Sequence, residues 1–123
     1  KAQKNNTDFV VWGSGYPLRE FIYSKDIARL AEWAVKNYNE PEPIIFSTSE
    51  EISIKDMVDL LVQEFNFKGN IIFDTTKPKG QFRKPSNNSK LRSYLPDFNF
   101  TPLEIGIKET VKWFIENYET ARK

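Results

Sequence analysis

The chain has 123 residues, of which 39% are hydrophobic and 15% aromatic, and its formal net charge is +1. This is the length of one domain with a modest core, and the near-neutral charge gives no general attraction to polyanions. Cysteine and histidine are both absent, which excludes disulfides, thiolate catalysis, and the commonest general base and transition-metal ligand. No apolar run approaches the length that crosses a bilayer, so we expect no membrane partner.

The first organised stretch is a predicted β-hairpin with a long tip. Residues 9–11 and 21–23 are rich in β-forming side chains, and the Gly-Ser-Gly-Tyr-Pro segment 13–17 between them is typical of a turn. Trp12 enters the tip and Arg19 leaves it, so an indole face and a guanidinium can converge on one ligand. The simpler alternative is a surface hairpin with a packed Trp12 and a solvated Arg19.

Two amphipathic helices are predicted downstream. Apolar residues at helical spacing indicate one helix over 24–38 and another over 54–65. Ser53 and Asp56 resemble a capping box at the start of the second helix, with Asp in the position usually held by Glu. Trp33 lies at the margin of the first helix's apolar stripe, so we expect that helix to bury a second face against a part of the protein outside this sequence.

Apolar runs at 44–48 and 70–73 flank the second helix and predict strands. Their separation is short enough for one right-handed βαβ unit with a parallel strand pair. The predicted fold is therefore α/β, with a β-hairpin, a βαβ unit and flanking helices in a single domain over 1–123.

The segment 75–96 is a cationic strip in an otherwise balanced chain. Proline and glycine make its first half a predicted loop, and a short helix is predicted over 88–95. The strip has no acidic residue and six basic ones, which are Lys77, Lys79, Arg83, Lys84, Lys90 and Arg92.

A last helix is predicted from residue 101 nearly to the end of the chain. Thr101 is expected to be its N-cap, with Pro102 in the first turn and Glu104 at the third helical position. Gly106 lies inside this helix and costs about 1 kcal/mol relative to Ala, so we expect close packing at that position.

The chain offers no recognisable catalytic set. The Gly-Ser-Gly segment 13–15 is followed by Pro17 and a predicted strand, so it lacks the strand-turn-helix context of a dinucleotide-binding fingerprint. The carboxylates are scattered, and no pair is suited to general acid and base catalysis. We expect no catalytic residue and no metal site in this chain, and a binding function instead.

A diphosphate attached to an aromatic base or a sugar is the ligand that the binding groups favour. Arg19, together with Lys84 or Arg83, would pair with phosphate oxygens, and Trp12 would stack or pack on a ring. The simpler alternative for the cationic strip is a solvated basic loop.

Two motifs carry a resemblance to a known family. The first is Trp-Gly-Ser-Gly-Tyr-Pro-Leu-Arg (12–19), and the second is Lys-Pro-Lys-Gly (77–80) followed by Arg83 and Lys84. Together they resemble the C-terminal part of the GDP-L-fucose synthase family, which belongs to the extended short-chain dehydrogenases. The resemblance extends over about 9–123, and the Arg-Glu-Phe run 19–21 alone is common to the wider superfamily.

The resemblance implies an enzyme that converts GDP-4-keto-6-deoxy-D-mannose to GDP-L-fucose by 3,5-epimerisation and NADPH-dependent 4-reduction. NADP and the catalytic residues, including the epimerising Cys and His, would belong to an N-terminal Rossmann domain absent from this chain. Residues 1–123 would then be the substrate-binding domain, inactive alone and without a cofactor of its own. The family implies a cytoplasmic homodimer for the complete enzyme, and we expect the separate domain to be a monomer.

The resemblance also implies roles for individual residues. Trp12 and Arg19 match substrate-contacting positions, and Lys84, with Arg83, matches the diphosphate-binding end of the basic loop. Lys79 departs from the family, which usually has Asp in the Lys-Pro-Asp-Gly motif. A lysine cannot accept the hydrogen bond that an Asp would accept from a sugar or ribose hydroxyl, so the nucleotide is held differently or that contact is dispensable.

Two alternatives remain at this stage. One is the substrate domain of another nucleotide-sugar epimerase or dehydratase of the same superfamily. The other is a nucleic-acid-binding module that uses the basic loop 77–92, with Phe82 and Trp12 as stacking platforms. The near-neutral charge of the chain and the absence of a second aromatic residue in the first half of the strip argue against it, so we expect no nucleic-acid partner.

Overall fold

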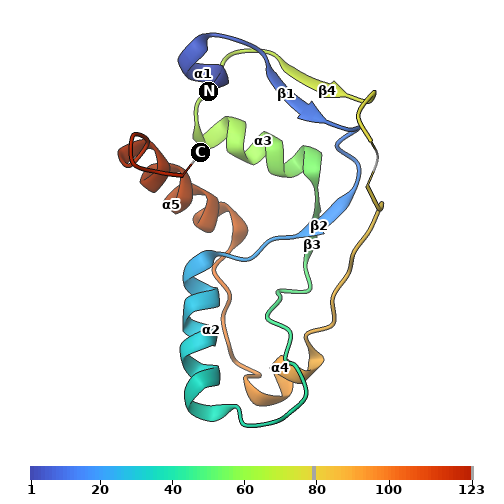
Figure 1. Cartoon of the computed structure of the whole chain (residues 1–123), viewed down its shortest axis with the longest axis vertical. Coiled ribbons are helices and arrows are strands. Elements are labelled where there is room, and N and C mark those ends of the chain that lie inside the picture. The colour runs from blue at the N-terminus through green and yellow to red at the C-terminus, as the bar shows by residue number, and fades with distance from the viewer. Residues whose placement is uncertain (79, 123) are drawn as a thin grey trace.

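The computed structural model describes residues 1–78 and 80–122. The described residues form helices and short strands in an elongated arrangement (Figure 1), and this confirms the predicted α/β class. In chain order the elements are α1 (Ala2–Asn5), β1 (Phe9–Trp12), β2 (Leu18–Glu20), α2 (Ser24–Asn37), β3 (Glu51–Ser53), α3 (Ile54–Glu64), β4 (Ile71–Asp74), α4 (Ser89–Tyr94) and α5 (Leu103–Glu116).

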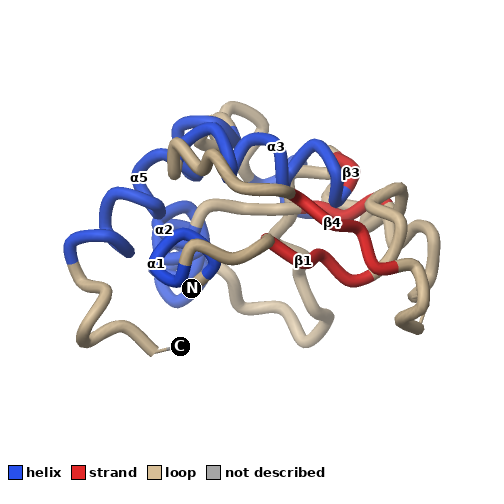
Figure 2. The backbone as a smooth tube through the Cα atoms, turned by 90° about the horizontal axis from the view of Figure 1, so that it is seen from above, coloured by secondary structure: helices blue, strands red, loops and turns tan. Residues whose placement is uncertain are grey.

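The strands form two separate two-stranded sheets. β1 pairs in parallel with β4, and β2 pairs antiparallel with β3. Seen from above, the β1–β4 pair lies on one side of the molecule, and α1, α2 and α5 lie on the other (Figure 2). The two sheets are joined by the turn that follows β1.

The predicted hairpin between 9–11 and 21–23 is wrong. The turn after β1 does not fold back, because its carbonyl groups are bound by the start of α3: Lys55 N–H donates to Gly15 O at 2.8 Å, and Ile54 N–H donates to Pro17 O at 3.0 Å. Gly15 has φ +79°, and an added Cβ would lie 2.6 Å from the Phe73 ring. The glycine therefore lets the chain turn away from β1 and enter a second sheet.

The predicted βαβ unit is also wrong. Residues 44–48 pair with no strand among the described residues, and the strand before α3 is β3, which lies antiparallel to β2. β4 is the predicted strand after α3, but its parallel partner is β1, with Phe9 opposite Ile71. The 44–48 segment is held by a side-chain contact instead: Ser47 is buried, and its hydroxyl donates a hydrogen bond to the carboxylate of Glu20 in β2.

The main hydrophobic core lies between α3 and α5. Met57 of α3 packs with Ile107 and Val111 of α5. Gly106 faces the chain just before α2, where an added Cβ would lie 3.2 Å from the Cβ of Tyr23. This confirms the close packing expected at Gly106. The partly buried residues around this core are Phe21, Ile52, Leu60, Leu61, Phe65 and Leu103.

The two predicted helix caps have different outcomes. Ser53 caps α3 as expected, because its hydroxyl accepts a hydrogen bond from Asp56 N–H at 3.0 Å. Thr101 does not cap α5, whose N-cap residue is Pro102. The Thr101 N–H donates at 2.7 Å to the carboxylate of Asp26, which is only 1% exposed. A buried carboxylate needs hydrogen-bond donors. Thr101 serves as a donor to Asp26 and therefore does not cap α5.

The lower part of the molecule is formed by α2, α4 and the loop between α2 and β3 (Figure 1). Trp33 of α2 contacts Tyr94 of α4 edge to face, with ring centroids 5.7 Å apart. The margin of the α2 stripe is therefore covered within this chain. Val35, on the same helix, is 89% exposed, so the expectation of a further partner surface for α2 stays a prediction.

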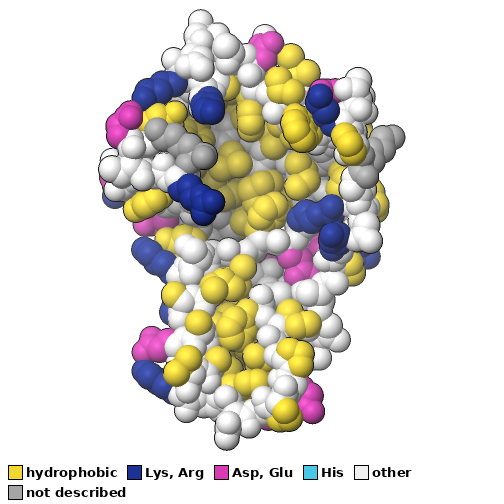
Figure 3. Space-filling view, in the orientation of Figure 1, with side chains coloured by type: hydrophobic (Ala, Val, Ile, Leu, Met, Phe, Trp, Pro, Cys, Tyr) yellow, Lys and Arg dark blue, Asp and Glu magenta, His cyan; other side chains and the backbone are white. Residues whose placement is uncertain are grey.

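Hydrophobic side chains also gather in a hollow in the upper half of the molecule (Figure 3). An open groove of about 690 Å³ lies between α1 and the ends of α3 and α5. Aromatic residues supply much of its lining, which includes Phe9, Phe65, Phe67 and Phe114. No helix in the described part of the chain is long and apolar enough to cross a membrane.

Candidate functional site

The first half of the cationic strip runs alongside β2. Leu18 N–H donates to Phe82 O at 2.8 Å, and the Arg19 Nη2 group donates to Gln81 O at 2.8 Å. Arg19 Nη1 also donates to the carbonyl of Leu18. The strip passes so close that a Cβ added at Gly80 would lie 3.6 Å from Arg19 Nη2. The structure thus joins Arg19 to the basic loop from which the sequence separates it.

Trp12 lies in the other sheet, at the end of β1. Its side chain is 72% exposed, and the ammonium group of Lys77 lies 5.5 Å from the ring centroid. Lys77 also lies 3.8 Å from the carboxylate of Asp74, the residue opposite Trp12 in the β1–β4 ladder. The described contacts bring Lys77, not Arg19, to the indole, so the expected convergence of Trp12 and Arg19 stays a prediction.

Arg83 is held by an acidic residue of β3. Its Nε donates to Glu51 Oε2 at 2.5 Å, and its Nη2 forms an ion pair with the same oxygen. This hydrogen bond and the charge of the carboxylate raise the pKa of Arg83. The side chain of Glu51 is only 10% exposed, and its Oε1 is buried without a hydrogen-bond partner among the described residues. Arg83 is the charge that compensates this carboxylate.

A second carboxylate, Glu20 of β2, binds the strip three residues further along. Glu20 accepts hydrogen bonds from Ser86 N–H at 2.7 Å, from the Ser86 hydroxyl at 2.5 Å and from the Ser47 hydroxyl at 2.6 Å. Burial alone raises the pKa of Glu20, but the hydrogen bonds from Ser47 and Ser86 together bring it below its ordinary value. Glu20 is therefore a charged acceptor that holds Ser86.

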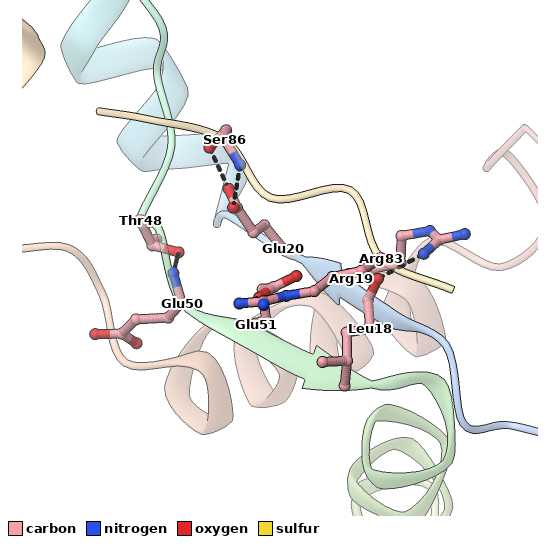
Figure 4. A network of polar contacts seen from close by, with 8 residues as sticks. All are labelled: Leu18, Arg19, Glu20, Thr48, Glu50, Glu51, Arg83 and Ser86. Carbon is pink, nitrogen blue, oxygen red and sulfur yellow. Dashed lines mark hydrogen bonds and ion pairs between the residues drawn. The ribbon is translucent and has the colours of Figure 1, made fainter. Parts of the chain in front are cut away.

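Figure 4 shows these groups as one polar cluster along the β2–β3 ladder. The guanidinium of Arg83 lies against Glu51 at one end, and that of Arg19 turns back to the Leu18 carbonyl at the other. Glu20 points toward Ser86, and the carboxylate of Glu50 points away from the cluster. The contacts come from three segments that are far apart in the sequence.

Lys84 lies between the two anchored residues, Arg83 and Ser86. Its side chain is exposed, and it forms no ion pair with a described acidic residue. Lys84 is thus the cation of this part of the strip that remains available to an anionic ligand. Lys79 lies outside the described residues.

Sequence reasoning missed the carboxylates that hold the strip. Glu20 stands inside the Arg-Glu-Phe run, which marked the resemblance without assigning a role to the glutamate. Glu51 stands in an acidic pair after a polar turn and gave no signal of a buried position. The available signal was the imbalance of charge, because acidic residues elsewhere in the fold are natural partners for an acid-free strip with six basic residues.

Two features of the described residues bear on cofactor and metal binding. The Gly-Ser-Gly turn 13–15 leads into β2 rather than a helix, so it lacks the N-terminal amides that cradle a dinucleotide pyrophosphate. Within 1–78 and 80–122, no group of three or more acidic residues is placed to bind a metal ion. What the described residues offer is an exposed lysine, Lys84, and an exposed indole, Trp12.

Comparison with known proteins shows which families and enzymes this chain is similar to. Residues 1–47 match the NAD dependent epimerase/dehydratase family. A GDP-L-fucose synthase from Dictyostelium discoideum is 51% identical over 99% of this chain and 39% of its own length. A probable GDP-L-fucose synthase from Drosophila melanogaster is 48% identical over 98% of the chain and 38% of its own length. The chain is similar to GDP-L-fucose synthases over nearly its whole length.

The fold agrees with this similarity. The crystal structure of a GDP-L-fucose synthetase from Naegleria fowleri bound to NADP superposes with a TM-score of 0.96 and 53% sequence identity. The match covers 99% of this chain and 39% of that one. The chain therefore spans about two fifths of the length of the GDP-L-fucose synthases that it resembles. This confirms the resemblance identified from the sequence motifs.

Proposed function

We propose that this chain is the GDP-sugar-binding domain of a GDP-L-fucose synthase. The complete enzyme would convert GDP-4-keto-6-deoxy-D-mannose to GDP-L-fucose by 3,5-epimerisation and NADPH-dependent 4-reduction. The observation that carries the proposal is the 51% identity to a GDP-L-fucose synthase over 99% of the chain. The exposed cation and aromatic ring of the described site support it, because a sugar nucleotide presents both a diphosphate and ring systems.

In this proposal the domain contributes binding and positioning. Lys84 would pair with the diphosphate as an exposed point charge. Arg19 and Arg83 would add to it, because a guanidinium has five N–H donors, and among the described residues protein oxygens contact two nitrogen atoms of each guanidinium. Trp12 would pack on a ring of the ligand, and Lys79 would lie beside the nucleotide. Binding the remote GDP end then fixes the reacting sugar ring.

Catalysis would take place at the boundary with an N-terminal Rossmann domain. That domain would hold NADP, and it would supply the hydride-transfer and epimerising groups. The glycine turn before β2 opens no helix, so it is not the pyrophosphate-binding turn that a dinucleotide needs. The separate chain would therefore be inactive. From the resemblance to the family we also propose that the separate chain is a monomer and that the complete enzyme is a cytoplasmic homodimer.

The other functions considered have weaker support. The similarity to GDP-L-fucose synthases does not favour a nucleic-acid module, and the contacts of the basic loop also argue against it. In the described part of the loop, Arg83 forms an ion pair with Glu51 and Lys90 forms one with Glu40, so these two cations are already engaged by acidic residues of the protein. Another nucleotide-sugar epimerase or dehydratase would differ in the base and sugar that it accepts.

Nucleotide selectivity tests the proposal. We define the complete enzyme as this chain joined to the proposed NADP-binding domain. Calorimetric titration of the complete enzyme with GDP, UDP and ADP is expected to show preferential binding of GDP. Lys84→Ala is expected to weaken GDP binding about tenfold, which corresponds to the loss of one charge-assisted contact. Equal affinity for the three nucleotides would contradict the assignment to GDP-sugars.

A further inference from the structure

The segment 81–86 is attached to the β2–β3 ladder at both of its ends. At its start, Gln81 O and Phe82 O accept hydrogen bonds from Arg19 and from the Leu18 backbone. Two carboxylates of the ladder make further contacts with the segment. Glu51 binds Arg83, and Glu20 binds Ser86.

The two carboxylates stand directly opposite each other, because Glu20 pairs with Glu51 in the antiparallel register. Like charges in such a pair repel, so each needs its own compensation. Arg83 supplies it for Glu51, and the donors of Ser47 and Ser86 supply it for Glu20. Arg83 and Ser86 belong to the same six-residue segment, and their contacts place the segment across the ladder.

Lys84 is located between these two anchors. Arg83 precedes it, and Pro85, whose ring fixes φ, separates it from Ser86. Its side chain is exposed and has no acidic partner among the described residues. A lysine side chain loses much conformational freedom when it binds. A backbone that is fixed on both sides of Lys84 leaves only the side chain to be ordered by the ligand.

We propose that Glu20 and Glu51 are positioning residues that hold Lys84 in place for an anionic ligand. This inference rests on the proposed function, in which the ligand is the diphosphate of a GDP-sugar. Glu20 and Glu51 do not touch the ligand in this account. They act through Ser86 and Arg83, and Arg83 serves chiefly as an anchor of the segment.

Steady-state kinetics of the complete enzyme test the inference with a double-mutant cycle. Glu20→Gln keeps the shape of the side chain but removes its charge. We expect it to raise KM for GDP-4-keto-6-deoxy-mannose about tenfold, while KM for NADPH stays within about twofold of the wild type. In a Lys84→Ala background, Glu20→Gln should raise KM for the GDP-sugar little further, because the lysine that Glu20 is proposed to position is absent. Glu51→Gln is expected to behave in the same way.

Two matched variants separate positioning from stability. Glu50→Gln alters the neighbouring carboxylate, which points away from the cluster (Figure 4), and should leave KM unchanged. Ser86→Ala removes one hydroxyl contact to Glu20 but keeps the N–H contact, so it should raise KM for the GDP-sugar less than Glu20→Gln does. It replaces Glu20→Gln as the test if that variant fails to fold. An unchanged KM in Glu20→Gln, or an equal rise with and without Lys84, would overturn the inference.

Hydrogen exchange at the Ser86 amide keeps this test independent of the proposed function. That amide donates to Glu20, so Glu20→Gln should speed its exchange and Glu50→Gln should not. If the wild-type enzyme fails to turn over the GDP-sugar, the proposed function is wrong. Unchanged exchange at Ser86 in Glu20→Gln would then still overturn the positioning role of Glu20, and faster exchange would still support it.

Discussion

Two adjoining regions of this molecule are held together by different kinds of contact. Between α3 and α5, apolar side chains such as Met57, Ile107 and Val111 pack without polar partners. Along β2 and β3, carboxylates, hydroxyls and guanidinium groups hold a loop that has few buried apolar atoms. The stability of the first region depends on the apolar area that is buried and on how well the side chains fit together. The second region depends on individual hydrogen-bond donors and acceptors. Substitutions in the first region should therefore change stability, and substitutions in the second should change ligand binding.

The core side of this comparison gives the largest expected effect. Ile107→Ala removes a buried side chain that packs against α3 and should lower the free energy of unfolding by about 3 kcal/mol. Ile115→Ala, on the exposed face of the same helix, should cost about 0.5 kcal/mol or less on packing grounds. Urea unfolding of the two variants measures both values. Equal destabilisation would show that the α3–α5 contact is not the main source of stability.

Arg19→Ala is the corresponding test on the site. The change removes the guanidinium that holds Gln81 and is proposed to contact the diphosphate. In the complete enzyme we expect KM for the keto sugar nucleotide to rise about thirtyfold, in line with losing hydrogen bonds to a charged group. KM for NADPH should barely change. An unaltered KM for the sugar nucleotide would remove Arg19 from the binding site.

Trp12→Ala should have a smaller effect on binding. The exposed indole is proposed to pack on a ring of the ligand, and a stacking contact contributes about 1 to 3 kcal/mol. We expect the affinity for GDP to fall about tenfold, with Trp12→Phe retaining most of it. Lys77→Met serves as a control, because it removes only the cation beside the indole. If Trp12→Ala and wild type bind GDP equally, the ring is not part of the site.

Lowering the pH should have the smallest effect on the free energy of unfolding. It tests the polar region separately from the core, because the effect depends on the charge of Glu20. Because the folded-state pKa of Glu20 lies below its ordinary value of 4.5, the unfolded chain takes up the proton first as the pH falls. The contribution of Glu20 to stability is complete above pH 4.5 and is lost as the pH falls through the folded-state pKa. The free energy of unfolding should thus fall more steeply below pH 4.5 in the wild type than in Glu20→Gln. Identical slopes would contradict the role of Glu20 as a charged acceptor.

The sequence predicted the helices better than the strand partners. The helices over 24–38 and 54–65 follow from apolar spacing within a few residues, and α2 and α3 confirm them with small shifts at their ends. Strand pairing depends on residues far apart in the chain, such as Phe9 opposite Ile71. The local pattern therefore allowed a hairpin that the fold does not form. β3 was missed because three residues with a glutamate at the start give almost no periodic signal.

The candidate site was predicted in part for the same reason. Its cations stand out in the sequence, because they lie in an acid-free strip. The acidic partners do not, since Glu51 lies 32 residues before Arg83 and Glu20 lies 66 residues before Ser86. Only the fold reveals that these carboxylates face the strip. The substrate roles of Trp12, Arg19, Arg83 and Lys84 remain predictions.

The product formed by the complete enzyme tests the central claim most directly. The enzyme would be incubated with GDP-4-keto-6-deoxy-D-mannose and NADPH, and the nucleotide sugars would be separated by chromatography and identified by NMR. We expect stoichiometric oxidation of NADPH and formation of GDP-L-fucose. Absence of GDP-L-fucose from a folded enzyme that binds NADPH would contradict the assignment of this chain to a GDP-L-fucose synthase.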